Sequence, residues 1–238
     1  MKKTAALLLA AMLALGILAG CSKEPAASGG DSSQPSSATS EASSQEAEET
    51  AKEYTPGIWV DDTRYESEFW GMAFTLPEGW LAATPEELGN VNDSGNELLS
   101  DEQRMQAEKA FEEGRSVTEM GVSDLYGTNI MMVVDNFTGV PGGSALTAEM
   151  YAGVVAEQLK AVPGIAYEVD EETVSKTIGG QEYVILSAWV EEYGLTQWYA
   201  MRKEGSYMLS VICTFADGDG EALMEEALEG FSLLDAAA

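Results

Sequence analysis

The stretch Gly180–Phe215 constrains the fold more than any other part of the chain. Its first run, Tyr183–Val190, is apolar at both sets of alternating positions, which is typical of a strand whose two faces are both covered. Leu195–Arg202 and Tyr207–Phe215 are also rich in β-forming residues, and Glu204-Gly205 between them suits a tight turn. Because such short connections force neighbouring strands to run antiparallel, the stretch predicts three consecutive strands of one sheet.

The rest of the chain supplies elements that can cover this sheet. The pattern predicts further strands at Tyr65–Phe69, Met72–Leu76, Val117–Leu125, Asn129–Phe137 and Glu172–Ile178. It predicts helices that begin at the capping residues Thr84, Ser100, Thr147 and Asp219, with Gly89–Gly95 as a loop and Gly114 as a helix end. Phe231, Leu233 and Leu234 are expected to pack back on the sheet.

The first twenty residues have the pattern of a secretory signal peptide, with lysines at the start, an apolar run and small residues before a cysteine. Leu18, Ala19 and Gly20 followed by Cys21 resemble the bacterial lipobox. The resemblance implies that Cys21 carries lipid, palmitate among the attached chains, and becomes the first residue of the mature protein. More than one acyl chain makes such anchoring stable. The alternative is an uncleaved N-terminal anchor with an incidental cysteine.

The sequence divides the chain into three parts. Residues 1–20 are the signal peptide, and residues 21–55 are a Ser- and Glu-rich tether with too little apolar content to fold. Residues 56–238 are long enough for a single α+β globular domain with its own core. The protein is therefore expected outside the cytoplasm, on the outer face of the cell membrane or, in a cell with two membranes, on an outer membrane.

Several segments between Tyr65 and Leu234 form a recognisable series: "YESEFWGMAFTLPEGW", a hairpin, a helix, "IGGQEYVIL", two more strands and a final helix that ends in "FSLL". Together they resemble a PsbP-like domain, as found in DcrB-like bacterial lipoproteins. The resemblance implies an antiparallel sheet covered by helices on both faces and an accessory or binding role. It carries over no catalytic residue. A cystatin-like helix on a sheet is the alternative fold, with fewer helices than the pattern indicates.

The residue types present exclude several chemistries. The chain has no histidine, which removes Ser-His-Asp and Cys-His catalysis and His-ligated metal sites. Once Cys21 carries lipid, Cys213 has no partner for an intramolecular disulfide, and its mid-strand position predicts a small buried hydrophobic residue. The protein is not expected to be an enzyme. Among the hypotheses about its function, a hydrolase that works through carboxylates is the least favoured.

The charge is strongly negative, with 41 acidic and 12 basic residues in the chain. From residue 56 onward, 34 acidic and eight basic residues give a formal charge of −26. Nucleic acid is therefore excluded as a partner, because its binding requires clustered Lys and Arg. Asp217–Glu221 has oxygen-bearing side chains at alternate positions, as a calcium loop requires, but the sixth and twelfth positions of an EF-hand loop would be Ala222 and Leu228. Helix capping by Asp219 is the favoured interpretation, and no cofactor is expected.

Aromatic residues supply the remaining hypotheses about binding. Trp59 and Trp70 are expected to be the more exposed of the five tryptophans, since they lie near the tether and a glycine turn, and they are candidate ligand contacts. The sequence favours a lipoprotein whose domain binds a protein partner in the cell envelope, through an apolar patch rimmed by polar groups. A solute- or glycan-binding lipoprotein is the competing hypothesis, and it predicts a concave pocket with exposed aromatic side chains.

Overall fold

The computed structural model describes residues 52–234, a mixed α+β fold of antiparallel sheets and helices. The predicted signal peptide, the lipobox and Cys21 lie outside this range. The strands are β1 (Ile58–Trp59), β2 (Arg64–Ser67), β3 (Met72–Thr75), β4 (Leu81–Ala82), β5 (Ser116–Ser123), β6 (Asn129–Asn136), β7 (Glu168–Val169), β8 (Val174–Ile178), β9 (Gln181–Val190), β10 (Leu195–Glu204), β11 (Tyr207–Ala216) and β12 (Phe231–Leu233). The α-helices are α2 (Pro85–Asn96), α3 (Asp101–Glu112), α4 (Ala148–Lys160) and α5 (Gly220–Leu228).

The three strands expected from Gly180–Phe215 are consecutive neighbours in the main sheet. β9, β10 and β11 are each ten residues long, and both pairs run antiparallel, with Thr196 of β10 opposite Trp189 on one side and Phe215 on the other. Gly205 in the turn between β10 and β11 has a φ of 55°, a conformation that glycine adopts without steric cost. The prediction from the short connections is confirmed.

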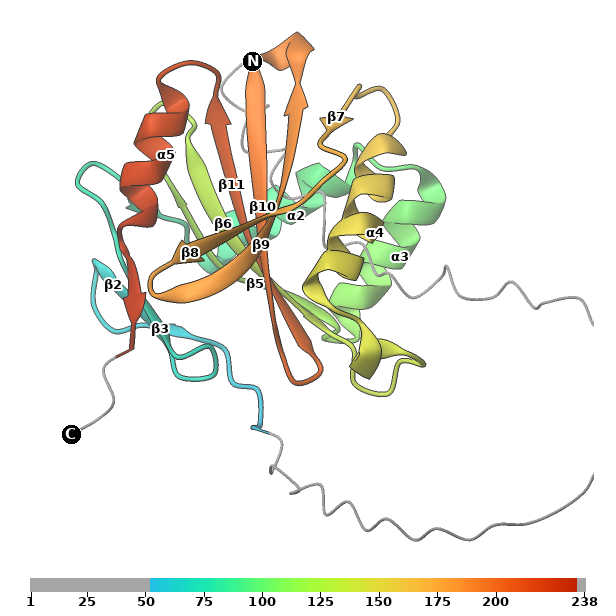
Figure 1. The fold of residues 1–238 in the computed structure, drawn as a ribbon, viewed down its shortest axis with the longest axis horizontal. Coiled ribbons are helices and arrows are strands. Elements are labelled where there is room, and N and C mark those ends of the chain that lie inside the picture. Colours follow the sequence, from blue (N-terminus) through green and yellow to red (C-terminus); the bar gives the residue numbers. More distant parts are fainter. Residues whose placement is uncertain (1–51, 235–238) are drawn as a thin grey trace, which may run out of the picture.

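The main sheet has the strand order β4-β5-β6-β11-β10-β9-β7, with β8 also paired to β9. Helix α4 packs on β9 and β10, and α2 and α3 pack on β5, so one face has a helical cover (Figure 1). On the opposite face α5 packs on β11. The rest of that face is covered by β2, β3 and β12, so the expected helical layer on both faces is not confirmed for this side.

The covering strands belong to a small second sheet with the order β1-β2-β3-β12. It joins the first described strands to the last one, because β12 pairs with β3 and places Phe231 opposite Phe74. The two rings lie with their centroids 4.6 Å apart. Phe231 is buried, as predicted, whereas Leu233 is 55% exposed because it follows the end of the shared core.

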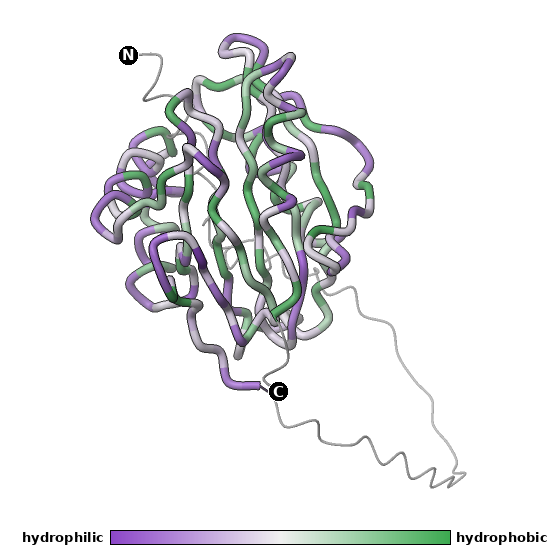
Figure 2. The backbone as a smooth tube through the Cα atoms, turned by 90° about the vertical axis from the view of Figure 1, so that its left-hand side faces the viewer, coloured by the Kyte–Doolittle hydropathy of each residue, from purple (hydrophilic) through white to green (hydrophobic). Residues whose placement is uncertain are grey.

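Two buried clusters occupy the two faces of the main sheet. Along β6, Met131 and Val133 face α4, whereas Ile130 and Met132 face the small sheet. Figure 2 shows the resulting pattern, with apolar strands between polar loops. Cys213 is fully buried on the second face, and burial raises the pKa of its thiol to about 12. Its predicted role as a small hydrophobic residue is confirmed.

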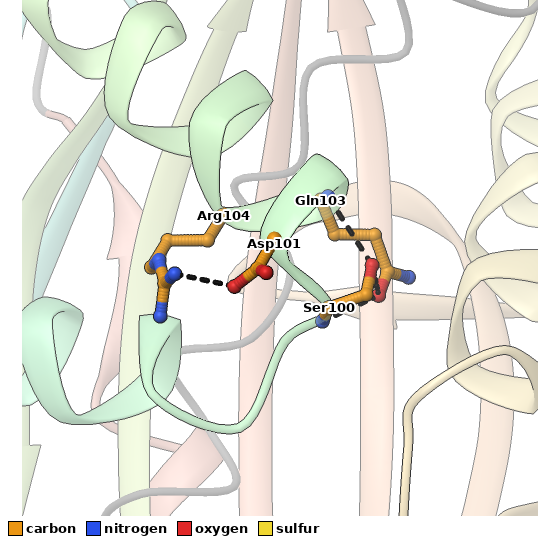
Figure 3. A network of polar contacts seen from close by, with 4 residues as sticks. All are labelled: Ser100, Asp101, Gln103 and Arg104. Atoms are coloured by element: carbon orange, nitrogen blue, oxygen red, sulfur yellow. Dashed lines mark hydrogen bonds and ion pairs between the residues drawn. The ribbon is translucent and has the colours of Figure 1, made fainter.

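Helices α2 and α3 begin with the predicted capping boxes. Ser100 accepts a hydrogen bond from the backbone N–H of Gln103, and the Gln103 side chain accepts one from the backbone N–H of Ser100 (Figure 3). Thr84 and Glu87 form the same reciprocal pair at the start of α2. These bonds satisfy N–H groups that the first helical turn leaves free. Gly114, with a φ of 64°, follows the end of α3 as expected.

Two predictions about helices are wrong. Gly89–Gly95 is not a loop, because α2 continues through it to Asn96, and the side chains of Leu88 and Val91 pack against the core beneath. Asp219 occupies the N-cap position of α5, but its side chain makes no capping hydrogen bond. Its φ of −70° and ψ of −11° are already helical, whereas a capping side chain requires extended backbone.

Candidate functional site

The two ends of the main sheet differ, and we name them by their residues. The distal end consists of the loops 77–80, 124–128, 191–194 and 217–220. The antiparallel register places these loops together, because β5 and β9 end there, β6 and β10 begin there, and β11 ends there. The base is the opposite end, and it holds the turn between β10 and β11, which Figure 1 shows at the lower end of the sheet.

The loop between β5 and β6 exposes two large apolar side chains at the distal end. Leu125 is 69% exposed and Tyr126 is 85% exposed. One carboxylate oxygen of Asp124 accepts hydrogen bonds from the backbone N–H groups of Tyr126, Gly127 and Thr128, at 2.7, 2.7 and 2.9 Å. This side chain therefore holds the loop in one conformation before anything binds to it.

A third exposed apolar side chain lies beside this loop. Leu81 of β4 is 61% exposed and is paired with Ser123, two residues before Leu125. The four distal loops contain no Lys or Arg, and their acidic residues are Glu78, Asp124, Glu191, Glu192, Asp217 and Asp219. We call Leu81, Leu125 and Tyr126 the distal patch, and we call the acidic side chains of the distal loops its carboxylate rim.

At the base, the first described residues lie against the domain. We call residues 52–57 the strap. Tyr54 stacks on Tyr207, with ring centroids 4.8 Å apart, and meets the edge of Phe69 at 5.2 Å. The Lys52 ammonium donates hydrogen bonds to the backbone carbonyls of Glu68 and Phe69 at 2.5 and 2.9 Å. Residues 52–55, which the sequence predicted as part of the tether, therefore lie on the folded domain. The ring contacts of Tyr54 hold them there.

A single carboxylate connects the strap to both sheets. Tyr54 and Tyr65 each donate a hydrogen bond of 2.5 Å to Glu119, one to each carboxylate oxygen. Glu119 lies at an irregularity of β5 between Thr118 and Met120, where the pairing with β6 shifts register. Burial and the Glu119 carboxylate raise the pKa of both tyrosines, so both stay protonated hydrogen-bond donors. The arrangement clamps the strap to the domain.

Two open pockets lie away from the distal patch. The first, of about 480 Å³, is at the base between the strap and the turn that joins β10 to β11. The second, of about 420 Å³, lies between α4 and the segment that precedes β8, and its carboxylates are Glu149, Asp170, Glu171 and Glu172. Within residues 52–234, no three Asp, Glu or Cys side chains are placed to hold a metal ion.

The core contains one buried carboxylic acid that lines neither pocket. Asp135 of β6 is 8% exposed and accepts a hydrogen bond of 2.5 Å from the Tyr151 hydroxyl of α4. Burial raises the pKa of Asp135 to about 6, although the bond from Tyr151 acts in the opposite direction. The bond joins α4 to the sheet from within the core.

The structure separates the two candidate tryptophans. Trp70 is 1% exposed, so the expectation that it is exposed is wrong. The glycine turn is present at Gly71, but it folds back onto the main sheet, where Arg202 lies 5.4 Å from the Trp70 ring and donates to its backbone carbonyl at 2.7 Å. Trp59 is half-buried against Tyr65, with ring centroids 5.7 Å apart.

The distal patch was not found by sequence reasoning. The pattern predicts a strand that ends at Leu125 and gives no role to the residues between it and the next strand. The signal that could have indicated it is the pair Leu125-Tyr126 inside a turn that begins with Asp124, because an aspartate at that position bonds the backbone ahead of it and directs the next side chains outward.

Comparison with known proteins adds one structural similarity to this geometry. No protein-family model matches the chain, and no curated protein matches it in sequence. Among solved structures, it is similar to the solution structure of cyanobacterial PsbP (CyanoP) from Synechocystis sp. PCC 6803, with a TM-score of 0.44 and 12% identity over 76% of this chain and 98% of that chain. At this level the likeness carries no argument about function. None of the helices in residues 52–234 is long and apolar enough to span a membrane.

Proposed function

We propose that the protein is an exported, lipid-anchored lipoprotein whose domain serves as a non-catalytic accessory module and binds a protein partner in the cell envelope through the distal patch. The observation that carries this proposal is the exposure of Leu81, Leu125 and Tyr126, which are 61, 69 and 85% exposed. Leu125 and Tyr126 lie on a loop that is already held in place, and Leu81 lies beside it. Apolar patches rimmed by polar groups are typical of protein interfaces.

The chemistry of the patch favours a protein partner over a small ligand. Tyrosine is enriched among the residues that dominate interface energies, because its large ring loses little conformational entropy on binding. The Asp124 hydrogen bonds fix the loop beforehand and so reduce the entropy lost on association. The carboxylate rim further favours a partner that surrounds an apolar socket with Lys or Arg.

The position of the strap supports an orientation in which the distal patch faces away from the lipid anchor. The described chain begins at Lys52 at the base, so the segment that would carry the lipid joins the domain at the end opposite the distal patch. The lipobox resemblance places the lipid on Cys21. Replacing Cys21 with alanine is therefore expected to release the protein from membranes, measured by fractionation. A variant that still sediments with the membrane would contradict the lipid anchor without affecting the proposed interface.

In-cell cross-linking of the native lipoprotein tests the interface directly. Mass spectrometry of the cross-linked products is expected to recover one recurrent envelope protein from wild type. The double substitution Leu125→Ala with Tyr126→Ala should abolish that product. Met150→Ala is the matched control, since Met150 is 58% exposed but lies on α4. An equal loss of the product in both variants, or in neither, would refute the assignment of the partner to the distal patch.

A further inference from the structure

The pocket at the base is separate from the distal patch and has a wall made by the strap. It has a volume of about 480 Å³, within the range of roughly 300–1,000 Å³ that is common for small-molecule sites. Tyr54, Phe69 and Tyr207 give it an aromatic side. The rings are fixed against one another, because Phe69 meets the edges of both tyrosines at 5.2 Å and the tyrosines stack at 4.8 Å.

Polar groups of both kinds surround these rings. Glu53 and Glu204 contribute carboxylates that only accept hydrogen bonds, and both side chains are exposed. Ser206 and Thr138 contribute hydroxyls that donate and accept, and Lys52 contributes an ammonium. A ligand that suits this pocket therefore has an apolar surface to lie on a ring and several groups that both donate and accept hydrogen bonds.

The charges of the pocket narrow the class of ligand further. An anion would meet the two carboxylates of Glu53 and Glu204, with one ammonium to offset them. An organic cation would find aromatic rings and carboxylates, but it would share the pocket with Lys52, whose ammonium already lies 5.6 Å from the Phe69 ring centroid. A neutral polyhydroxylated ligand meets neither repulsion, and its C–H surface can pack on an aromatic ring.

We propose that this pocket binds a neutral saccharide of one or two sugar rings. The ligand lies against the tyrosine rings while its hydroxyls bond to Glu204 and to the polar side chains opposite. Because Lys52, Glu53 and Tyr54 form one wall, a bound sugar also contacts the strap and holds it on the domain. Occupancy of the pocket is thereby coupled to the segment that connects the domain to its lipid.

Two measurements on the full-length protein, in a detergent without a sugar headgroup, test this proposal. Isothermal titration calorimetry uses glucose, galactose, N-acetylglucosamine, cellobiose and chitobiose as probes, with choline and acetate as charged comparisons. At least one saccharide is expected to bind saturably, and choline and acetate are not. The same saccharide should slow tryptic cleavage after Lys52, while cleavage after Lys23 in the same sample provides the reference.

Substitutions assign the binding to the pocket. Glu204→Gln removes a charged acceptor and is expected to weaken binding about tenfold, the effect of losing one hydrogen bond to a charged group. Tyr207→Ala should abolish binding, and its thermal melt checks that the variant is folded. Glu226→Gln, at an exposed position on α5, should leave binding unchanged. Failure of all five saccharides to bind, or binding that Glu204→Gln leaves intact, overturns the proposal. The partner interface at the distal patch is unaffected by either result.

Discussion

The base and the distal end of the main sheet differ in how deeply their aromatic side chains are buried. At the base, Phe69 is 3% exposed and lies among Tyr54, Trp70 and Tyr207. At the distal end, Tyr126 is 85% exposed and makes no such ring contact. The buried ring of Phe69 therefore contributes to folding, whereas the exposed ring of Tyr126 is free to contribute to binding.

Basic residues show the same contrast. Of the basic residues within 52–234, only Lys52, Arg202 and Lys203 form no ion pair. All three donate instead to backbone carbonyls around the base. The basic side chains at the base therefore have partners within the chain, whereas the charged residues of the distal loops are all acidic and have no basic residue among them. The difference indicates that a protein interface is more readily found where exposed charged and aromatic side chains have no partner within the chain.

Truncating a ring at the base should have the largest effect on stability. Phe69→Ala removes a buried aromatic side chain and leaves a cavity, so the free energy of unfolding is expected to fall by about 3–5 kcal/mol. Urea denaturation followed by circular dichroism measures it. A loss below about 1 kcal/mol would mean that the ring cluster at the base is loosely packed, and the contrast between the two ends would fail.

The buried acid near the base should make stability depend on pH. Asp135 is paired with Met208, next to the turn between β10 and β11. Burial raises the pKa of Asp135 from 3.8 to about 6 in the folded protein, so the folded state holds the proton more tightly. Its contribution to stability is therefore present below about pH 4 and is lost as the pH rises through 6.

Asp135→Asn isolates this contribution from the other carboxylates. Between pH 4 and pH 7 the wild type should lose on the order of 2–3 kcal/mol of stability relative to the variant, at about 1.4 kcal/mol for each pKa unit. The measurement is the difference between the two urea midpoints across this range, which cancels the shared effect of the remaining acids. A constant difference would show that burial does not raise the pKa of Asp135.

Much of the fold follows from local patterns in the sequence. The double-sided apolar run of β9 predicted a strand covered on both faces, and the short connections predicted its antiparallel neighbour β10. The capping boxes at Thr84 and Ser100 predicted where two helices begin. The extent of α2 was not predictable, because the contacts of Leu88 and Val91 with the core outweigh the weak helical preference of the Gly- and Asn-rich segment that follows.

The sites depend on contacts between distant residues and could not be predicted. Trp70 is buried against Arg202, which lies more than one hundred residues away in the sequence. Tyr54 belongs to the fold because Glu119 accepts its hydroxyl. Neither partner is marked by spacing in the sequence. By contrast, the strongly acidic surface was predictable from composition, and it reappears in the carboxylate rim of the distal patch.

A smaller loss of stability is expected when the loop between β5 and β6 loses the side chain of Asp124. Asp124→Ala removes the acceptor of three backbone hydrogen bonds, but water can replace it at this exposed site. The free energy of unfolding should fall by about 1 kcal/mol. Hydrogen exchange of residues 125–128 should quicken, and cross-linking to the partner should weaken although Tyr126 is intact. Unchanged exchange would mean that the backbone alone sets the loop conformation.

Truncating the exposed ring itself should have the smallest effect on folding and a large effect on binding. Tyr126→Ala removes a side chain that is 85% exposed, so stability is expected to change by no more than about 0.5 kcal/mol. The cross-linked partner should nevertheless be lost, since a central interface tyrosine commonly contributes 2 kcal/mol or more, roughly a thirtyfold change in affinity. Phe69→Ala provides the opposite case, with low stability and an intact distal patch. If Tyr126→Ala unfolds the domain as much as Phe69→Ala does, the ring serves the fold at both ends and the distal patch is not a docking surface.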